Sequence, residues 1–152
     1  MHLLLADDDL DDCLLFQEAL EEIPLSTRLT TVHNGEQLMQ WLGEPNELPA
    51  VLFLDLNMPR KNGFECLREI KNNSRLKALP VIIFSTSFEQ GPMDQLYQGG
   101  AHYYIRKPNQ FSQLKALIQQ VLVLAQTNTL SQPARENFVL RGDLKSPEHA
   151  KN

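Results

Sequence analysis

Short apolar runs alternate with stretches of helical periodicity along the first 126 of the 152 residues, and this pattern narrows the choice of fold more than any other feature. The apolar runs, which we expect to form strands, are 3–6, 27–32, 50–54, 81–84 and 101–106. The run 50–54 is apolar on both faces, as in a central parallel strand that helices cover on both sides. Alternating strand and helix patterns are typical of βα units around a parallel sheet. The sequence therefore predicts an α/β fold with five strands and five helices.

The predicted helices have recognisable ends. Asp9 is expected to cap the first helix, and Pro24 to end it. The apolar face expected for this first helix is Leu10, Cys13, Leu14, and Ala19 or Leu20. Pro92 suits the first position of the fourth helix, and the last helix is predicted over 109–126.

Residues 127–152 differ in character from the rest of the chain. They are mostly polar and contain Pro133 and Pro147, with one apolar cluster at 138–140. A segment of this length is too short for an independent effector domain. We therefore divide the chain into a folded domain, 1–126, and a C-terminal tail, 127–152. The tail is expected to be flexible, or to dock reversibly through 138–140 on its own domain or on a second copy.

Charge and composition exclude some classes of protein. The formal net charge of −5 disfavours non-specific attraction to nucleic acid, so direct nucleic-acid binding is not expected. No apolar run approaches the roughly 18 residues that a membrane span needs. The only two cysteines, Cys13 and Cys66, lie in apolar-periodic segments and are expected to be small buried hydrophobes. We expect a cytoplasmic protein without a membrane anchor.

Acidic residues follow two of the predicted strands. Asp7, Asp8 and Asp9 come directly after the first strand, and Asp55 ends the third. In an open parallel sheet, the carboxyl ends of neighbouring strands form the usual ligand site. Two carboxylates about 4 Å apart repel by roughly 4 kcal/mol at an effective dielectric near 20, so the cluster implies a cation, a bound proton, or both. Oxygen ligands of this kind suit Mg²⁺. Asp9 is expected to be mainly a helix cap.

A hydroxyl and an ammonium group follow the next two strands. Ser85 ends the fourth strand and Lys107 ends the fifth, just before Pro108. A hydroxyl can donate a hydrogen bond to a phosphoryl group, and an ammonium group can neutralise its charge. Taken alone, Ser85 could be a strand-end residue and Lys107 a solvated surface charge. Their position on successive strand ends favours a phosphoryl site.

These residues together resemble the receiver domain of response regulators in two-component signalling, over about 2–126. The motifs that carry the resemblance are, in chain order, Asp7-Asp8, Leu54-Asp55, Met58-Pro59, Asn62-Gly63, Ser85, and Tyr104-Ile105-Arg106-Lys107-Pro108. The resemblance implies a flavodoxin-like, doubly wound sheet of five parallel strands in the order 2-1-3-4-5. In the long segment between Asn72 and Pro80 and in the Ser85-Thr86-Ser87 run, the chain also resembles single-domain regulators that pair with bacteriophytochrome-type kinases.

The resemblance also implies a role for each site residue. Asp55 would be the phosphoacceptor. Its carboxyl group is expected to be ionised at pH 7, so it would need no general base to act as a nucleophile. Asp7 and Asp8 would hold Mg²⁺ with Asp55, and Asn57 would offer its backbone carbonyl to the same ion. The remaining implied assignments are the switch hydroxyl Ser85 rather than Thr86, the switch aromatic Tyr104, the phosphoryl-binding Lys107, and a cis Lys107–Pro108 bond.

The implied function is that of a phosphorelay response regulator rather than an enzyme. The phosphoryl group would come from a sensor histidine kinase or a phosphotransfer protein. With no effector domain attached, the output would be binding of a downstream protein, onward phosphotransfer, or a homodimer.

Three other classes of protein share part of this pattern. A phosphohydrolase of the haloacid dehalogenase type needs a carboxylate two residues after its nucleophile, where this chain has Asn57. A flavodoxin-like cofactor binder needs a phosphate-cradling loop after the first strand, where this chain has three aspartates. A degenerate receiver would bind partners without phosphorylation, although every residue type for phosphorylation is present here.

Overall fold

The computed structural model describes residues 1–45, 47–86 and 90–141. Five strands form one parallel sheet in the order β2-β1-β3-β4-β5. Their bounds are His2–Ala6 for β1, Arg28–Val32 for β2, Val51–Leu54 for β3, Val81–Ser85 for β4 and Tyr103–Arg106 for β5. The predicted α/β class, strand order and number of strands are confirmed.

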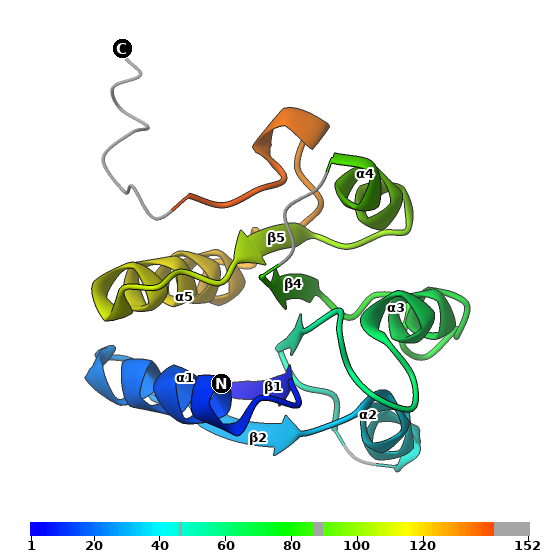
Figure 1. Cartoon of the computed structure of the whole chain (residues 1–152), viewed down its shortest axis with the longest axis horizontal. Coiled ribbons are helices and arrows are strands. Elements are labelled where there is room, and N and C mark those ends of the chain that lie inside the picture. The colour runs from blue at the N-terminus through cyan, green and yellow to red at the C-terminus, as the bar shows by residue number, and fades with distance from the viewer. Residues whose placement is uncertain (46, 87–89, 142–152) are drawn as a thin grey trace.

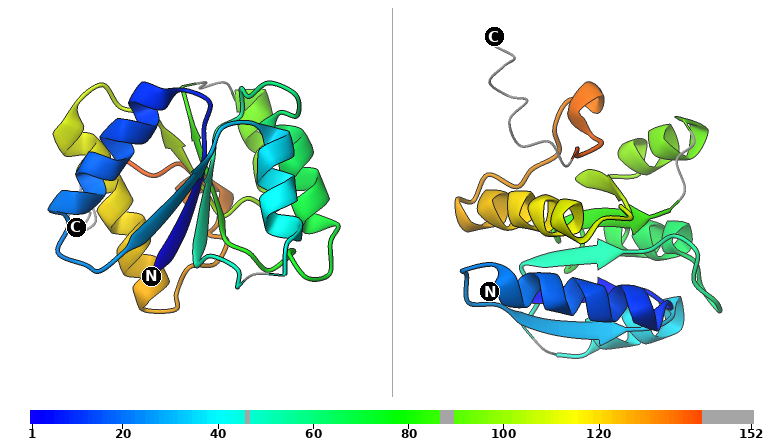
Figure 2. Two further views of the ribbon diagram at one scale, coloured as in Figure 1. Left: turned by 90° about the horizontal axis from the view of Figure 1, so that it is seen from below. Right: turned by 60° about the vertical axis from the view of Figure 1, so that its left-hand side comes forward.

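Five α-helices connect and cover these strands, as predicted. Their bounds are Leu10–Glu22 for α1, Gly35–Gly43 for α2, Gly63–Lys71 for α3, Gln90–Gln98 for α4 and Phe111–Gln126 for α5. Helices α1 and α5 lie on one face of the sheet, and α2, α3 and α4 lie on the other (Figures 1 and 2). None of the helices in the described part of the chain is long and apolar enough to cross a bilayer.

The central strands supply both halves of the core because successive side chains point to opposite faces. In β1, Leu3 and Leu5 pack toward α1 and α5, whereas Leu4 and Ala6 pack toward α2 and α3. The four residues of β3 alternate in the same way and are fully buried. Burial on both faces explains why these strands are continuous apolar runs.

Helix α1 begins where predicted, but it buries only part of its predicted apolar face, at Cys13, Ala19 and Leu20. The carboxylate of Asp9 accepts hydrogen bonds from the backbone N–H groups of Asp11 and Asp12, so the predicted cap is confirmed. Leu10 and Leu14, however, are 65% and 56% exposed, and the prediction that they face the core was wrong. Leu14 is two residues from the buried Phe16, which places it about 160° around the helix. The buried residues are Cys13, Phe16, Ala19 and Leu20.

The C-terminal segment lies along the outer edge of β5. After α5 the chain turns back through a short 3₁₀ helix, Arg135–Asn137, and Val139 forms a parallel bridge with Tyr104. Phe138 is fully buried against the domain. The rest of the tail, including Pro147, lies outside the described residues. Residues 138–140 therefore pair with the outer edge of β5 through one isolated bridge (Figure 1).

Candidate functional site

Two buried carboxylates meet where β1 and β3 end. The backbone N–H of Asp55 donates to the carbonyl of Ala6, and that of Asp7 donates to the carbonyl of Val32. Each aspartate is therefore held by a hydrogen bond that its backbone N–H donates to the adjacent strand. Oxygen atoms of Asp7, Asp8 and Asp55 all lie within 4.8 Å of one another, so the structure brings the three predicted carboxylates together.

Burial and mutual repulsion set the electrostatics of this cluster. The side chain of Asp7 is fully buried and Asp55 is 5% exposed, whereas Asp8 is exposed. Burial, followed by the negative charge of Asp7, raises the pKa of Asp55 to about 7. Burial also raises the pKa of Asp7, although hydrogen bonds from Lys107 and the backbone of Asp9 oppose this. Burial therefore opposes the ionised form of Asp55 that we expect at pH 7, because it penalises the charged carboxylate.

The cluster fits a divalent cation. Three carboxylates from β1, the following turn and β3 offer oxygen atoms at one point, and two of them are poorly solvated. Hard cations take oxygen ligands of this kind, and a positive charge would favour the ionised forms of Asp7 and Asp55. Asn57 lies at the same site, since its backbone N–H bonds to the Asp55 carboxylate and lowers that group's pKa. Its proposed carbonyl contact to a metal stays a prediction.

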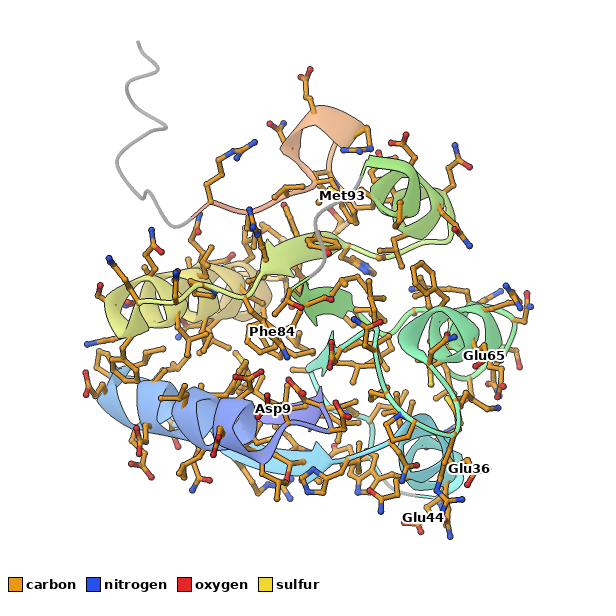
Figure 3. All side chains as sticks on the ribbon, in the orientation of Figure 1. Asp9, Glu36, Glu44, Glu65, Phe84 and Met93 are labelled. Atoms are coloured by element: carbon orange, nitrogen blue, oxygen red, sulfur yellow. The ribbon has the colours of Figure 1, made fainter. Side chains whose placement is uncertain are left out.

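Lys107 reaches this cluster from the end of β5 and makes three ion pairs. Its Nζ lies 2.9 Å from Asp7 Oδ2, 2.8 Å from Asp12 Oδ2 and 3.7 Å from Asp55 Oδ2. The ammonium group also lies 5.3 Å from the ring centroid of Phe84, which sits between the sheet and helices α1 and α5 (Figure 3). Burial opposes the charge on Lys107, but hydrogen bonds to Asp12 and Asp7 outweigh it and raise its pKa. The Lys107–Pro108 peptide bond is trans, contrary to expectation, and trans is the lower-energy isomer of most X–Pro bonds.

Sequence reasoning missed Asp12. It stands in the first turn of α1, three residues after the N-cap Asp9 and therefore close along the chain to Asp7 and Asp8. This spacing could have indicated a further carboxylate near the site. Asp12 and Lys107 also line an open cleft of about 620 Å³ with Thr86, Arg106 and Asn109.

A second missed residue is His33, which follows β2 directly. Its Nδ1 lies 3.2 Å from the backbone carbonyl of Asp7. Because β2 pairs with β1, the end of β2 necessarily lies at the same sheet edge, and this position was a usable signal. The contact helps to fix the turn that presents Asp7 and Asp8.

Ser85 and Tyr104 form a buried polar pair beside the carboxylates. Ser85 is the last residue of β4 and is fully buried, whereas the rival Thr86 is exposed. The side chains of Ser85 and Tyr104 share a hydrogen bond, which lowers the pKa of Tyr104, although burial raises that pKa more. The ring of Tyr104 points into the protein, and 1% of the residue is exposed. The structure thus links the end of β4 to the centre of β5.

Residues 3–119 match the family model of the response regulator receiver domain. Response regulator Rcp1 from Synechocystis sp. is 31% identical over an alignment of 124 residues that covers 78% of this chain and 84% of Rcp1. The Mn²⁺-bound structure of Rcp1 has a TM-score of 0.75 at 29% identity, covering 88% of this chain and 99% of Rcp1.

Two further solved structures are similar. The phosphorylated cyanobacterial phytochrome response regulator RcpA has a TM-score of 0.77 at 32% identity and covers 84% of this chain and 94% of RcpA. The bacteriophytochrome response regulator RtBRR has a TM-score of 0.67 at 28% identity, covering 99% of this chain and 90% of RtBRR. With a match over 3–119, the fold and the converging carboxylates, the chain belongs to the response regulator receiver domain family of two-component signalling.

Proposed function

We propose that the chain accepts a phosphoryl group on Asp55 from a phosphohistidine and signals by binding a downstream protein. The observation that carries this proposal is the position of Asp55, buried at the end of β3 with Asp7 and Asp8 within 4.8 Å and Lys107 at 3.7 Å. The donor would be a sensor histidine kinase or a phosphotransfer protein. Similarity to RcpA and RtBRR favours a phytochrome-type kinase as the sensor.

The ionised carboxylate of Asp55 would act as the nucleophile. One of its oxygens attacks phosphorus, the bond between phosphorus and the histidine nitrogen breaks, and the product is an acyl phosphate. Asp7, Asp8, Asp55 and the backbone carbonyl of Asn57 would hold Mg²⁺, which offsets the repulsion between the carboxylate and the phosphoryl oxygens. The Mn²⁺-bound structure of Rcp1 supports a divalent cation in this family.

Lys107 would change partners during the reaction. It now contacts Asp7 and Asp12 more closely than Asp55. A phosphoryl group on Asp55 would place anionic oxygens beside Nζ, and these oxygens would compete with both aspartates. Ser85 would donate its hydroxyl to another phosphoryl oxygen and so lose its present hydrogen bond with Tyr104.

The exposed leucines of α1 suit recognition of a kinase. Leu10 and Leu14 are four residues apart and lie on the same side of α1, at the end of the helix nearest to Asp7 and Asp8. An amphipathic helix of a partner could pack on them while presenting a phosphohistidine to Asp55. This arrangement supports a helical phosphodonor protein rather than a small molecule as the natural donor.

The chain would act as a receiver rather than a multiple-turnover enzyme. It assists its own phosphorylation and the later hydrolysis of the acyl phosphate. Residues 1–126 would form the receiver domain, residues 127–152 a tail, and the protein would act in the cytoplasm. Its output would be a protein contact, either with a downstream protein or with a second copy.

Incubation with acetyl phosphate and Mg²⁺, followed by intact-mass measurement, tests the proposal. We expect an acid-labile and base-labile mass gain of one phosphoryl group that EDTA prevents and that Asp55→Asn abolishes. A degenerate receiver would gain no mass in any condition. A phosphohydrolase would instead release inorganic phosphate over many turnovers without a lasting adduct. Either result would overturn the proposal.

A further inference from the structure

The C-terminal segment pairs with the backbone of β5 through one parallel bridge at the edge of the sheet. The N–H of Tyr104 donates to the carbonyl of Phe138 at 3.0 Å, and the N–H of Leu140 donates to the carbonyl of Tyr104 at 2.9 Å. Strand β5 is the last strand of the sheet, so its outer backbone groups would otherwise need another partner. The segment satisfies those groups at Tyr104.

An aromatic anchor holds this segment in place. Phe138 is fully buried, and its ring packs edge-on against Tyr97 of α4 and Tyr104 of β5, with centroids 5.3 and 6.2 Å away. The groove between α4 and β5 therefore accepts a large apolar side chain at one position. Backbone pairing with one deep side-chain pocket is a common way to recognise an extended peptide.

Polar contacts with α4 fix the register of the segment. Gln132 Nε2 donates to the carbonyls of Tyr97 and Ala101 at 2.7 and 2.9 Å. The hydroxyl of Tyr97 donates to the carbonyl of Pro133 at 2.6 Å. Arg135 pairs with Asp94 at 2.7 Å and lies over the ring of Phe138. The hydrogen bonds and the ion pair run from Gln132 to Leu140 and join the segment to α4, to β5 and to the residues between them.

Tyr104 connects this groove to the candidate phosphorylation site. Its hydroxyl shares a hydrogen bond with Ser85, its ring contacts Phe138, and its backbone pairs with residues 138 and 140. A displacement of Ser85 toward Asp55 would remove the hydrogen bond that holds Tyr104 in its present position. The packing of Phe138 depends on that position. Displacement of Ser85 and release of Phe138 are therefore coupled through the side chain of Tyr104.

We propose that residues 131–140 are a built-in, displaceable ligand of the groove between α4 and β5, and that phosphorylation of Asp55 weakens their docking through Ser85 and Tyr104. The phosphorylation link rests on the proposed function. The vacated groove takes an extended segment of a downstream protein that has an aromatic anchor and a basic residue three positions before it, as Arg135 precedes Phe138. The tail thus competes with the output partner for one surface.

Hydrogen exchange in the full chain tests the link to phosphorylation. The amide of Leu140 reports docking directly, because it donates to Tyr104. We expect the peptide that contains Leu140 to exchange at least about tenfold faster after treatment with acetyl phosphate and Mg²⁺, as local opening becomes easier. Intact mass of the same sample measures phosphorylation, and Asp55→Asn under the same treatment should remain protected. Phosphorylated protein with unchanged protection overturns the link, whereas a sample that gains no phosphoryl group overturns the proposed function and the link with it.

A peptide of residues 131–141 added in trans tests the groove without phosphorylation. It should bind saturably to full-length Phe138→Ala, whose own tail lacks the anchor, and at least about tenfold more weakly to the wild type, where the tail is already docked. The same peptide with Phe138→Ala is the matched control and should not bind. Equal binding of both peptides overturns the anchored groove. Leu140 protection that rises with protein concentration, together with dimers in sedimentation, would assign the docked segment to a second copy and overturn intramolecular docking.

Discussion

The ammonium group of Lys107 lies closer to Asp12 than to Asp55, at 2.8 Å against 3.7 Å. Lys107 is thus held by a carboxylate of α1 while Asp55 carries no phosphoryl group. The side chain of Asp12 is partly exposed, so the ion pair is reversible rather than a fixed part of the core. If Asp55 is phosphorylated as proposed, Asp12 would compete with the phosphoryl group for Lys107.

Asp12→Asn should therefore speed phosphorylation of Asp55 by acetyl phosphate. A partly exposed ion pair contributes about 1 kcal/mol at most. Its loss should therefore lower the activation free energy of phosphorylation by no more than that, an increase of up to about fivefold in rate. A time course of intact mass measures the rate. Asp11→Asn removes the same charge from the same turn without touching Lys107 and should have little effect. An equal increase in both variants would indicate a general charge effect, and a slower rate in Asp12→Asn would contradict the competition.

Replacement of Asp55 by Asn should stabilise the metal-free protein at high pH. The pKa of Asp55 is raised from its ordinary value of 3.8 to about 7 in the folded protein, so between these pH values the folded state binds more protons than the unfolded state. The stability contributed by the protonated group is present below pH 4 and is lost as the pH rises through 7. Each pKa unit corresponds to about 1.4 kcal/mol of stability, and relaxation around the carboxylate relieves part of this cost. Asp55→Asn should therefore be more stable than the wild type by about 1–3 kcal/mol at pH 8.

Urea unfolding in EDTA at pH 8 and at pH 4.5 measures this effect. The stability difference between Asp55→Asn and the wild type should be large at pH 8 and small at pH 4.5. Mg²⁺ should reduce the difference at pH 8, because a cation favours the ionised carboxylate of the wild type. A difference of the same size at both pH values would show that desolvation of Asp55 is not its cause.

Leu14→Ser should slow phosphotransfer from a phosphorylated histidine kinase but not from acetyl phosphate. Leu14 is 56% exposed, so its loss should change stability by no more than about 0.5 kcal/mol. Radiolabel transfer from the kinase and mass gain with the small donor provide the two rates. Val123→Ser on α5 is a matched control, since Val123 is 50% exposed but lies near the opposite end of the α1–α5 layer. Unchanged transfer from several such kinases would argue against α1 as the docking surface.

The adjacent residues Asp8 and Asp9 should have different roles. Asp8 faces the carboxylate cluster, whereas the side chain of Asp9 caps α1. Asp8→Ala should weaken Mg²⁺ binding strongly with little change in stability, and Asp9→Ala should cost about 1 kcal/mol of stability with little change in Mg²⁺ affinity. Calorimetric Mg²⁺ titration and urea unfolding of both variants test this. Equal loss of Mg²⁺ affinity in the two variants would show that the division of roles is wrong.

Most of the fold followed from the sequence because buried parallel strands carry an unmistakable pattern. Residues 51–54 are apolar at every position since both faces of β3 are covered. The face of α1 was predicted wrongly at Leu10 and Leu14 because an exposed apolar surface has the same composition as a buried one. Only the spacing relative to Phe16 and Ala19 distinguishes the two.

The contacts between the site residues were harder to predict than the residues themselves. Strand ends identify Asp7, Asp55, Ser85 and Lys107, since parallel strands end at one edge. Nothing in their spacing shows that Lys107 binds Asp12, or that Tyr104 joins Ser85 to Phe138. Those contacts depend on how α1 and the C-terminal segment pack on the sheet.

Mapping which residue carries the phosphoryl group tests most directly the central claim that Asp55 is the phosphoacceptor. Sodium borohydride cleaves an acyl phosphate of aspartate and leaves homoserine at the modified position. After treatment with phosphorylated kinase or acetyl phosphate in Mg²⁺, peptide sequencing by mass spectrometry should find homoserine at residue 55 and at no other aspartate. Homoserine at Asp7, Asp8 or Asp12, or its absence from a sample that has gained a phosphoryl group, would contradict the assignment of Asp55 as the phosphoacceptor.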